Sequence, residues 1–180
     1  MERKCGDCSL CCKLVPVKSI GKPGYTRCRF QRHKGCLIHD TPNYPGDCAV
    51  WACRWLLNAA GETSRPDRTH IVIDIMPDYV TVILPNGEPQ QIEAVQCWVD
   101  PKYPEAHEDK DFRDFVETLA MDGVLCLLRY PDGVAKMLFA PSMMPDNKFY
   151  LREDGMTKEE QHTPQQLAEV LEEIRMEDDE

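Results

Sequence analysis

Residues 71–84 read Ile71-Val72-Ile73-Asp74-Ile75-Met76-Pro77-Asp78-Tyr79-Val80-Thr81-Val82-Ile83-Leu84. β-branched and aromatic residues fill both halves of this stretch, and such residues favour extended strands. The Pro77-Asp78 pair in the middle is typical of a turn. The stretch therefore predicts a hairpin of two strands, 71–76 and 79–84, and with it a β-sheet.

The sequence that follows extends the predicted sheet and adds a helix. A turn around Asn86-Gly87 precedes a third predicted strand over 91–99. A helix beginning at Asp109 or Asp111 is predicted from apolar residues at helical spacing, with Gly123 past its end. A second hairpin is predicted from strands 124–129 and 134–140, with a short additional piece at 143–144 and 149–151.

A last helix is predicted from Thr163, which stands as the N-cap before Pro164 at the first helical position. The acidic tail 177–180 is expected to be solvated. Residues 70–180 are thus expected to form an α+β domain, an antiparallel sheet with two flanking helices. A loop-rich segment over residues 1–57, called here the cysteine segment, precedes it and packs against it.

Eight of the ten cysteines lie in the cysteine segment. They are Cys5, Cys8, Cys11, Cys12, Cys28, Cys36, Cys48 and Cys53. Four thiols within eight residues cannot all reach relaxed disulfide geometry with one another, whereas a two-residue gap suits a metal. We therefore predict that these eight cysteines are metal ligands. Cys97 and Cys126 lie in strand-like runs and are expected to be small buried hydrophobic residues.

The metal is expected to be zinc, most simply two ions in closed structural sites. The alternative is a 4Fe–4S cluster, because Cys5, Cys8 and Cys11 have ferredoxin-like spacing and Cys48 or Cys53 could complete the set. Thiolate ligands suit both metals, so ligand type does not decide between them. His33 and His39 are the candidate nitrogen ligands, and His39 is expected to pack against the cluster instead.

The order of these cysteine motifs resembles the CxxCxxCC family of zinc- or iron-chelating domains, also described as YkgJ-like cysteine-cluster proteins. The resemblance rests on Cys5-x2-Cys8-x2-Cys11-Cys12, on Gly35-Cys36-Leu37-Ile38-His39 and on Pro45-x2-Cys48-x2-Trp51, within residues 3–57. The family usually has Tyr, Arg and Phe where this chain has His39, Tyr44 and Trp51. The resemblance implies metal chelation. A related cluster in bacterial flagellin lysine methylases implies, as an alternative, a role beside redox or methyl-transfer chemistry.

The 180 residues carry a formal charge of −10, unevenly distributed. Residues 1–70 hold twelve Lys and Arg against six Asp and Glu, and the acidic excess lies in the rest. Arg27, Arg29, Arg32 and Lys34 are expected to offset the charge of metal thiolates. Nucleic acid is the less favoured partner of these cations, since the remaining chain would repel it.

No apolar run is long enough for a membrane helix, and the first residues contain no export signal. The chain is therefore expected to be cytoplasmic. No nucleophile, base and acid stand in a recognisable catalytic motif. We expect a zinc-binding cysteine-cluster protein that acts through an unidentified protein partner rather than through catalysis.

Overall fold

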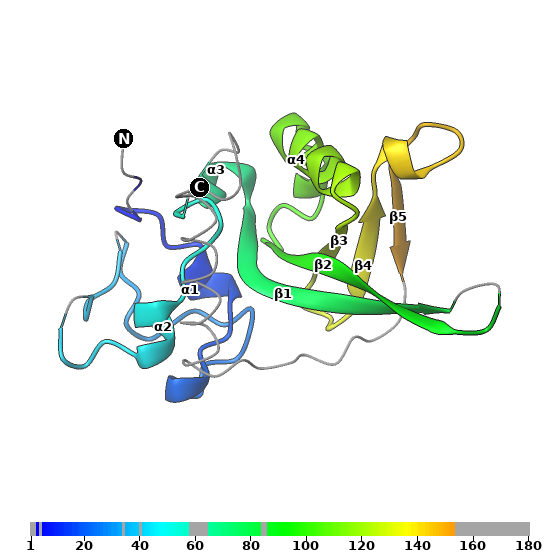
Figure 1. Cartoon of the computed structure of the whole chain (residues 1–180). Helices are drawn as coiled ribbons and strands as arrows, with labels where there is room; N and C mark the ends of the chain where they lie inside the picture. Colours follow the sequence, from blue (N-terminus) through cyan, green and yellow to red (C-terminus); the bar gives the residue numbers. More distant parts are fainter. Residues whose placement is uncertain are drawn as a thin grey trace, which may run out of the picture.

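The computed structural model describes residues 3, 5–33, 35–39, 41–57, 65–83 and 86–153. Its centre is a five-stranded sheet in the order β1-β2-β3-β4-β5. The strands are β1 (Ile71–Ile83), β2 (Pro89–Val99), β3 (Leu125–Arg129), β4 (Ala135–Phe139) and β5 (Tyr150–Glu153). Helix α4 (Lys110–Met121) covers one face, and the cysteine segment lies beside β1 (Figure 1). The predicted α+β class is confirmed.

One continuous strand, β1, forms where the sequence predicted a hairpin of 71–76 and 79–84, so that prediction is wrong. β1 pairs with β2 from Ile71 opposite Val99 to Ile83 opposite Pro89. The register shifts between Ile73 and Pro77, as at a β-bulge. Proline has no N–H for the ladder, and a bulge leaves a residue unpaired, so the strand tolerates Pro77 there without reversing.

Strand β3 runs parallel to β2, which corrects the expectation of a wholly antiparallel sheet. Ala94 lies opposite Leu125 in this pair, and Trp98 lies opposite Arg129. The chain leaves β2, passes through η2 (Ala106–Glu108) and α4, and returns in the same direction, as a helical crossover requires. The other three strand pairs are antiparallel. They include the predicted β3–β4 hairpin and the short β5.

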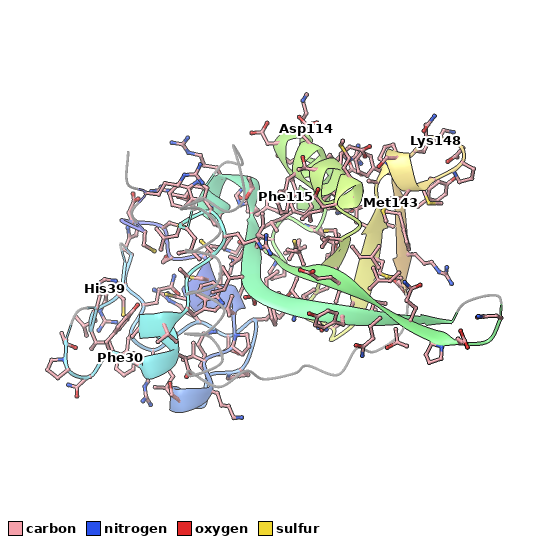
Figure 2. The ribbon with its side chains drawn as sticks, viewed as in Figure 1. Phe30, His39, Asp114, Phe115, Met143 and Lys148 are labelled. Carbon is pink, nitrogen blue, oxygen red and sulfur yellow. The ribbon has the colours of Figure 1, made fainter. Side chains whose placement is uncertain are left out.

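Helix α4 supplies the larger hydrophobic core. Asp109 caps it by accepting a hydrogen bond from the backbone N–H of Phe112. Its apolar residues pack on β2 and β3, and Figure 2 shows Phe115 pointing toward the sheet and Asp114 away from it. Cys97 and Cys126 are 0% and 1% exposed within this core, as expected of small buried residues. The helix predicted from Thr163 lies outside the described residues.

Short helices and turns make up the described part of the cysteine segment. They are α1 (Cys11–Leu14), η1 (Lys18–Ile20) and α2 (Gly46–Val50). Isolated bridges join Val17 to Lys22 and Gln31 to Cys36. A further short helix, α3 (Pro66–Thr69), leads into β1, and η3 (Pro141–Met143) follows β4. Within the described part of the chain, no helix combines the length and the apolar character needed to cross a membrane.

The cysteine segment packs on the β1–β2 end of the sheet. Leu14 of α1 is fully buried against Val72 and Trp98. Gly24 also lies against the Trp98 ring, since a Cβ at this position would be 3.4 Å from it. Lys13 of α1 donates to both oxygens of Asp100, at 2.6 and 2.7 Å, directly after β2 ends. These contacts fix the position of the cysteine-bearing helix on the sheet.

Candidate metal centre

Three of the predicted ligands form a chain of contacting sulfurs at α1. Cys11 makes side-chain hydrogen bonds with Cys5 and with Cys12, and these bonds lower the pKa of Cys5 to about 7 and also lower the pKa of Cys12. The same hydrogen bonds, together with burial, raise the pKa of Cys11. The vicinal pair Cys11-Cys12 therefore lies at the middle of the cysteine arrangement.

Cys8 and Cys53 lie on the Cys5 side of this chain. The Cys8 N–H donates to the Cys5 carbonyl at 3.0 Å, and the Cys5 thiol donates to the Cys8 carbonyl at 3.3 Å. Cys53 packs in one hydrophobic cluster with Cys8 and Cys11. Burial, with a smaller contribution from the charges of Cys5 and Cys8, raises the pKa of Cys53 to about 11.

Cys28 and Cys48 lie on the Cys12 side. The Cys28 N–H donates to the Cys12 carbonyl at 2.9 Å. Burial raises the pKa of Cys48 to about 12, and the nearby charges of Cys12, Cys28 and Cys36 contribute. Helix α2, which carries Cys48, is held to η1 because Asp47 accepts a 2.8 Å hydrogen bond from the Ser19 N–H.

Cys36 reaches the same side through a tight turn of the chain. Leu37 N–H donates to the Phe30 carbonyl and Arg32 N–H to the Gly35 carbonyl, so the chain reverses between Cys28 and Cys36. Gly35 has a positive φ of 74°, a conformation that glycine adopts without strain. All eight predicted ligands are thus brought around α1, and all ten cysteines are free thiols.

Lys22 is a candidate functional residue that the sequence analysis missed. It is only 7% exposed, and its Nζ donates to the carbonyls of Val15 and Pro23. Burial lowers the pKa of Lys22, whereas the charges of Cys28, Cys12, Cys11 and Cys48 raise it. A buried ammonium group therefore lies beside the thiols. In the sequence, Lys22 stands between glycines in the stretch Gly21–Gly24. These glycines predict a turn, but they do not predict that the lysine is buried.

The arginines named from the sequence lie farther out. Arg27, Arg29 and Arg32 are exposed, and Lys34 lies outside the described residues. The Arg29 guanidinium lies over the Phe30 ring, 4.8 Å from its centroid. The Arg3 guanidinium lies 5.3 Å from the Trp55 ring centroid. Both rings already carry a cation, which weakens their use as stacking surfaces for nucleic-acid bases.

The two candidate nitrogen ligands, His33 and His39, are exposed. The His39 ring lies 4.9 Å from the Tyr44 ring, and Figure 2 shows His39 and Phe30 at the outer part of the cysteine segment beside α2. The His39 charge helps to lower the pKa of Cys5, after the larger effect of Cys11. His39 therefore packs at the edge of the cluster.

The cysteine sulfurs do not close on one point. Among the described residues, only Glu105, His107 and Glu108 form a set of three ligand atoms that all lie within 4.8 Å of one another. In a tetrahedral zinc site with Zn–S bonds of about 2.3 Å, the sulfurs are roughly 3.8 Å apart. Ligation by the cysteines therefore requires their side chains to rotate inward. Eight soft donors beside a buried cation fit zinc or iron–sulfur chemistry.

The glutamate–histidine set does not match the chemistry of a built site. Glu105 and Glu108 are exposed, and exposed acidic groups are common without a metal. His107 is buried, and its Nδ1 lies 3.2 Å from the Pro104 carbonyl.

Comparison with known proteins adds no relative: no family model, no curated protein and no solved structure matches this chain. The geometry of the cysteine segment and the sequence motifs therefore carry the functional argument.

Proposed function

We propose that this chain is a metal-binding cysteine-cluster protein of the CxxCxxCC type, in which the eight cysteines hold zinc. The observation that carries the proposal is the convergence of cysteines from four separate parts of the chain on α1, beside the buried Lys22. Thiols at this density are typical of metal ligands, which lose their protons on binding.

The zinc would be structural. A four-thiolate zinc site is closed and has no open position for water. The described part of the cysteine segment has only short helices and isolated bridges, so metal ligation would supply the folding free energy that a larger core supplies elsewhere. Reduced thiols of this kind persist in the cytoplasm, which is the compartment that we propose.

The chain would act through a protein partner rather than through catalysis. One surface hollow, between the cysteine segment and the sheet, is lined by Gly24, Tyr25, Trp98, Arg129, Tyr130, Pro131 and Gly133. These residues include no cysteine, histidine or carboxylate, and Arg129 is already paired with Asp78 and Gln96. Such a lining offers a shaped, partly aromatic surface.

An iron–sulfur cluster is the second candidate, because the structure places Cys53 beside Cys5 and Cys8. Three closely spaced cysteines and one remote cysteine are the ligand pattern of a 4Fe–4S cluster. In this case the chain would serve redox or methyl-transfer chemistry as an accessory protein.

Anaerobic purification followed by elemental analysis and a visible absorption spectrum of the same sample tests the proposal. We expect two zinc ions per chain and no visible absorption band. Iron with acid-labile sulfide and a broad visible band would contradict zinc and establish the second candidate. A chain that binds neither metal when purified or reconstituted under reducing conditions would overturn both.

A further inference from the structure

The contacts of the eight cysteines divide them into two groups of four. The first tetrad is Cys5, Cys8, Cys11 and Cys53. The second tetrad is Cys12, Cys28, Cys36 and Cys48.

Local structure holds the first tetrad together. Reciprocal contacts between Cys5 and Cys8 close one turn of the chain, and Cys11 contacts Cys5 through its thiol. Cys53 arrives from the end of the cysteine segment and packs with Cys8 and Cys11. Arg54, the next residue, is fixed to β1 because its N–H donates to the Ile73 carbonyl at 3.1 Å.

A different set of loops holds the second tetrad together. The backbone bond from Cys28 N–H to Cys12 carbonyl brings the 28–36 turn onto α1. The Gln31 side chain supports this placement, since its Nε2 donates to Ser9 Oγ at 2.8 Å. The bridge between Gln31 and Cys36 then carries Cys36 to the same region. Tyr44 lies near both Cys48 and Cys36, since its pKa is raised by burial and then by their charges, followed by those of Cys11 and Cys12.

The vicinal cysteines separate the two groups. Consecutive residues of an α-helix point about 100° apart around its axis, because 3.6 residues make one turn. Cys11 and Cys12 are the first two residues of α1, so their side chains leave the helix in different directions, although their two thiols are hydrogen-bonded to each other. The Cys11 thiol also contacts Cys5, whereas the Cys12 backbone accepts from Cys28, so the Cys11–Cys12 contact marks the boundary between the two groups.

We propose that the eight cysteines form two separate four-sulfur metal sites, one held by Cys5, Cys8, Cys11 and Cys53 and the other by Cys12, Cys28, Cys36 and Cys48. This assignment rests on the proposed metal binding and holds for two zinc ions or two cubane clusters alike. It excludes a single shared cluster in which one cysteine bridges two metals.

Paired substitutions test the assignment in the full chain. Cys8→Ser with Cys53→Ser removes half of the first tetrad, and Cys36→Ser with Cys48→Ser removes half of the second. Each of these variants should bind half of the wild-type metal by native mass spectrometry and retain that half against a chelator as the wild type does. The variant with Cys8→Ser and Cys36→Ser loses one ligand from each site. The chelator should therefore remove all of its metal more easily than it removes metal from the wild type.

Cys126→Ala is the matched control, because its thiol lies in the sheet core and its loss should release no metal. Far-ultraviolet circular dichroism shows whether the sheet has formed in each variant, and the two within-tetrad pairs check each other if one misfolds. The partition is wrong if both within-tetrad variants lose all of their metal. It is also wrong if the variant with Cys8→Ser and Cys36→Ser keeps half of the metal and holds it against the chelator as tightly as the wild type does. A wild-type chain that binds no thiophilic metal instead overturns the proposed function.

Discussion

The indole nitrogen of Trp51 donates a 2.9 Å hydrogen bond to Oδ1 of Asp74, and so links the cysteine segment to β1. The other oxygen of this buried carboxylate accepts a 3.2 Å bond from the indole of Trp98 on β2. Arg54 adds a third contact, because its Nε donates to the Asp74 carbonyl. Trp51 stands two residues before Cys53, so this carboxylate positions one predicted metal ligand through the backbone.

Substitution of Asp74 by asparagine is expected to destabilise the protein. The amide replaces one acceptor oxygen by an NH2 group that faces an indole N–H, which leaves a buried donor unsatisfied. Hydrogen bonds to charged groups contribute about 1.5–3 kcal/mol each, so the free energy of unfolding should fall by roughly 2–4 kcal/mol in urea titrations. Asp132→Asn is the control, since Asp132 accepts only at an exposed turn. Equal midpoints for D74N and wild type would contradict the role of the carboxylate.

The ion pair between Lys13 and Asp100 is expected to show strong coupling in a double-mutant cycle. The Asp100 side chain is 5% exposed and that of Lys13 is 30% exposed. Lys13→Met leaves a buried carboxylate without its cation, and this should cost roughly 2–4 kcal/mol. Lys13→Met with Asp100→Asn should cost clearly less than the sum of the two single changes.

The exposed pair Lys110–Asp114 provides the matched comparison, since its side chains are 84% and 63% exposed. Lys110→Met should leave the free energy of unfolding close to the wild-type value, because solvent screens an exposed ion pair. Additive effects at Lys13 and Asp100 would show that the contact does not hold α1 on the sheet.

Much of the sheet could be predicted from the sequence because its signals are local. β-branched runs marked the strands, and Asp109 with the spacing of Phe112, Phe115 and Leu119 marked α4. Two features depended on contacts between distant residues. The sequence around Pro77 predicts a turn, and only the pairing of β2 along both halves of β1 shows that the strand continues. The parallel pairing of β2 with β3 depends on where α4 packs.

The candidate site was predictable as a set of cysteines but not as an arrangement. Spacing identifies ligands that share a short motif, and Cys5 and Cys8 do lie together. Cys53 joins them only because the Trp51–Asp74 contact brings the end of the segment back to the sheet. Lys22 is buried by the Val17–Lys22 bridge, and no local pattern predicts that burial.

Stability at alkaline pH should depend on Tyr130. Burial raises the pKa of Tyr130 to about 12, and the charges of Glu105, Cys126 and Asp132 add to this effect. An unfolded tyrosine has a pKa of about 10. Between about pH 10 and pH 12 the unfolded chain therefore loses the phenol proton while the folded chain keeps it, and the free energy of unfolding falls. The contribution is fully present below pH 10 and is lost as pH rises through the folded value.

Tyr130→Phe should remove this component, so urea titrations at pH 9.5 and 11.5 should show a smaller loss of stability than in the wild type. Other titrating groups act equally in both proteins and cancel in the difference. Tyr79→Phe should behave as the wild type because Tyr79 is 55% exposed. Identical pH profiles for Y130F and wild type would refute the role of Tyr130.

Metal removal is expected to unfold the cysteine segment and leave the sheet folded. The core between α4 and the sheet is built from residues of β1–β4, α4 and η2 and the loops beside them, whereas the segment depends on ligation. A chelator under reducing conditions should abolish hydrogen-exchange protection at α1 and over 28–37 and preserve it in β2 and β3. Simultaneous loss of protection in both regions would show one cooperative unit instead.

Lys22→Met is expected to weaken metal binding at the second tetrad. Four thiolates around a divalent ion carry a net charge of about −2, and Lys22 is a buried cation that interacts with Cys28, Cys12, Cys11 and Cys48, three of which belong to the second tetrad. Loss of a group that supports metal ligands in this way typically lowers metal affinity by about 10–100-fold. The chelator concentration that removes the metal of the second tetrad should fall by a similar factor. The half held by the first tetrad should resist as before.

Lys22→Arg separates charge from packing in the same experiment. It keeps the cation and should retain more metal than K22M, even if its larger head group disturbs the bonds to Val15 and Pro23 and lowers the free energy of unfolding. If K22M and K22R release metal equally and both have a lower free energy of unfolding, Lys22 only stabilises the turn. If K22M alone releases half of the metal, the charge of Lys22 stabilises the thiolates of Cys12, Cys28, Cys36 and Cys48.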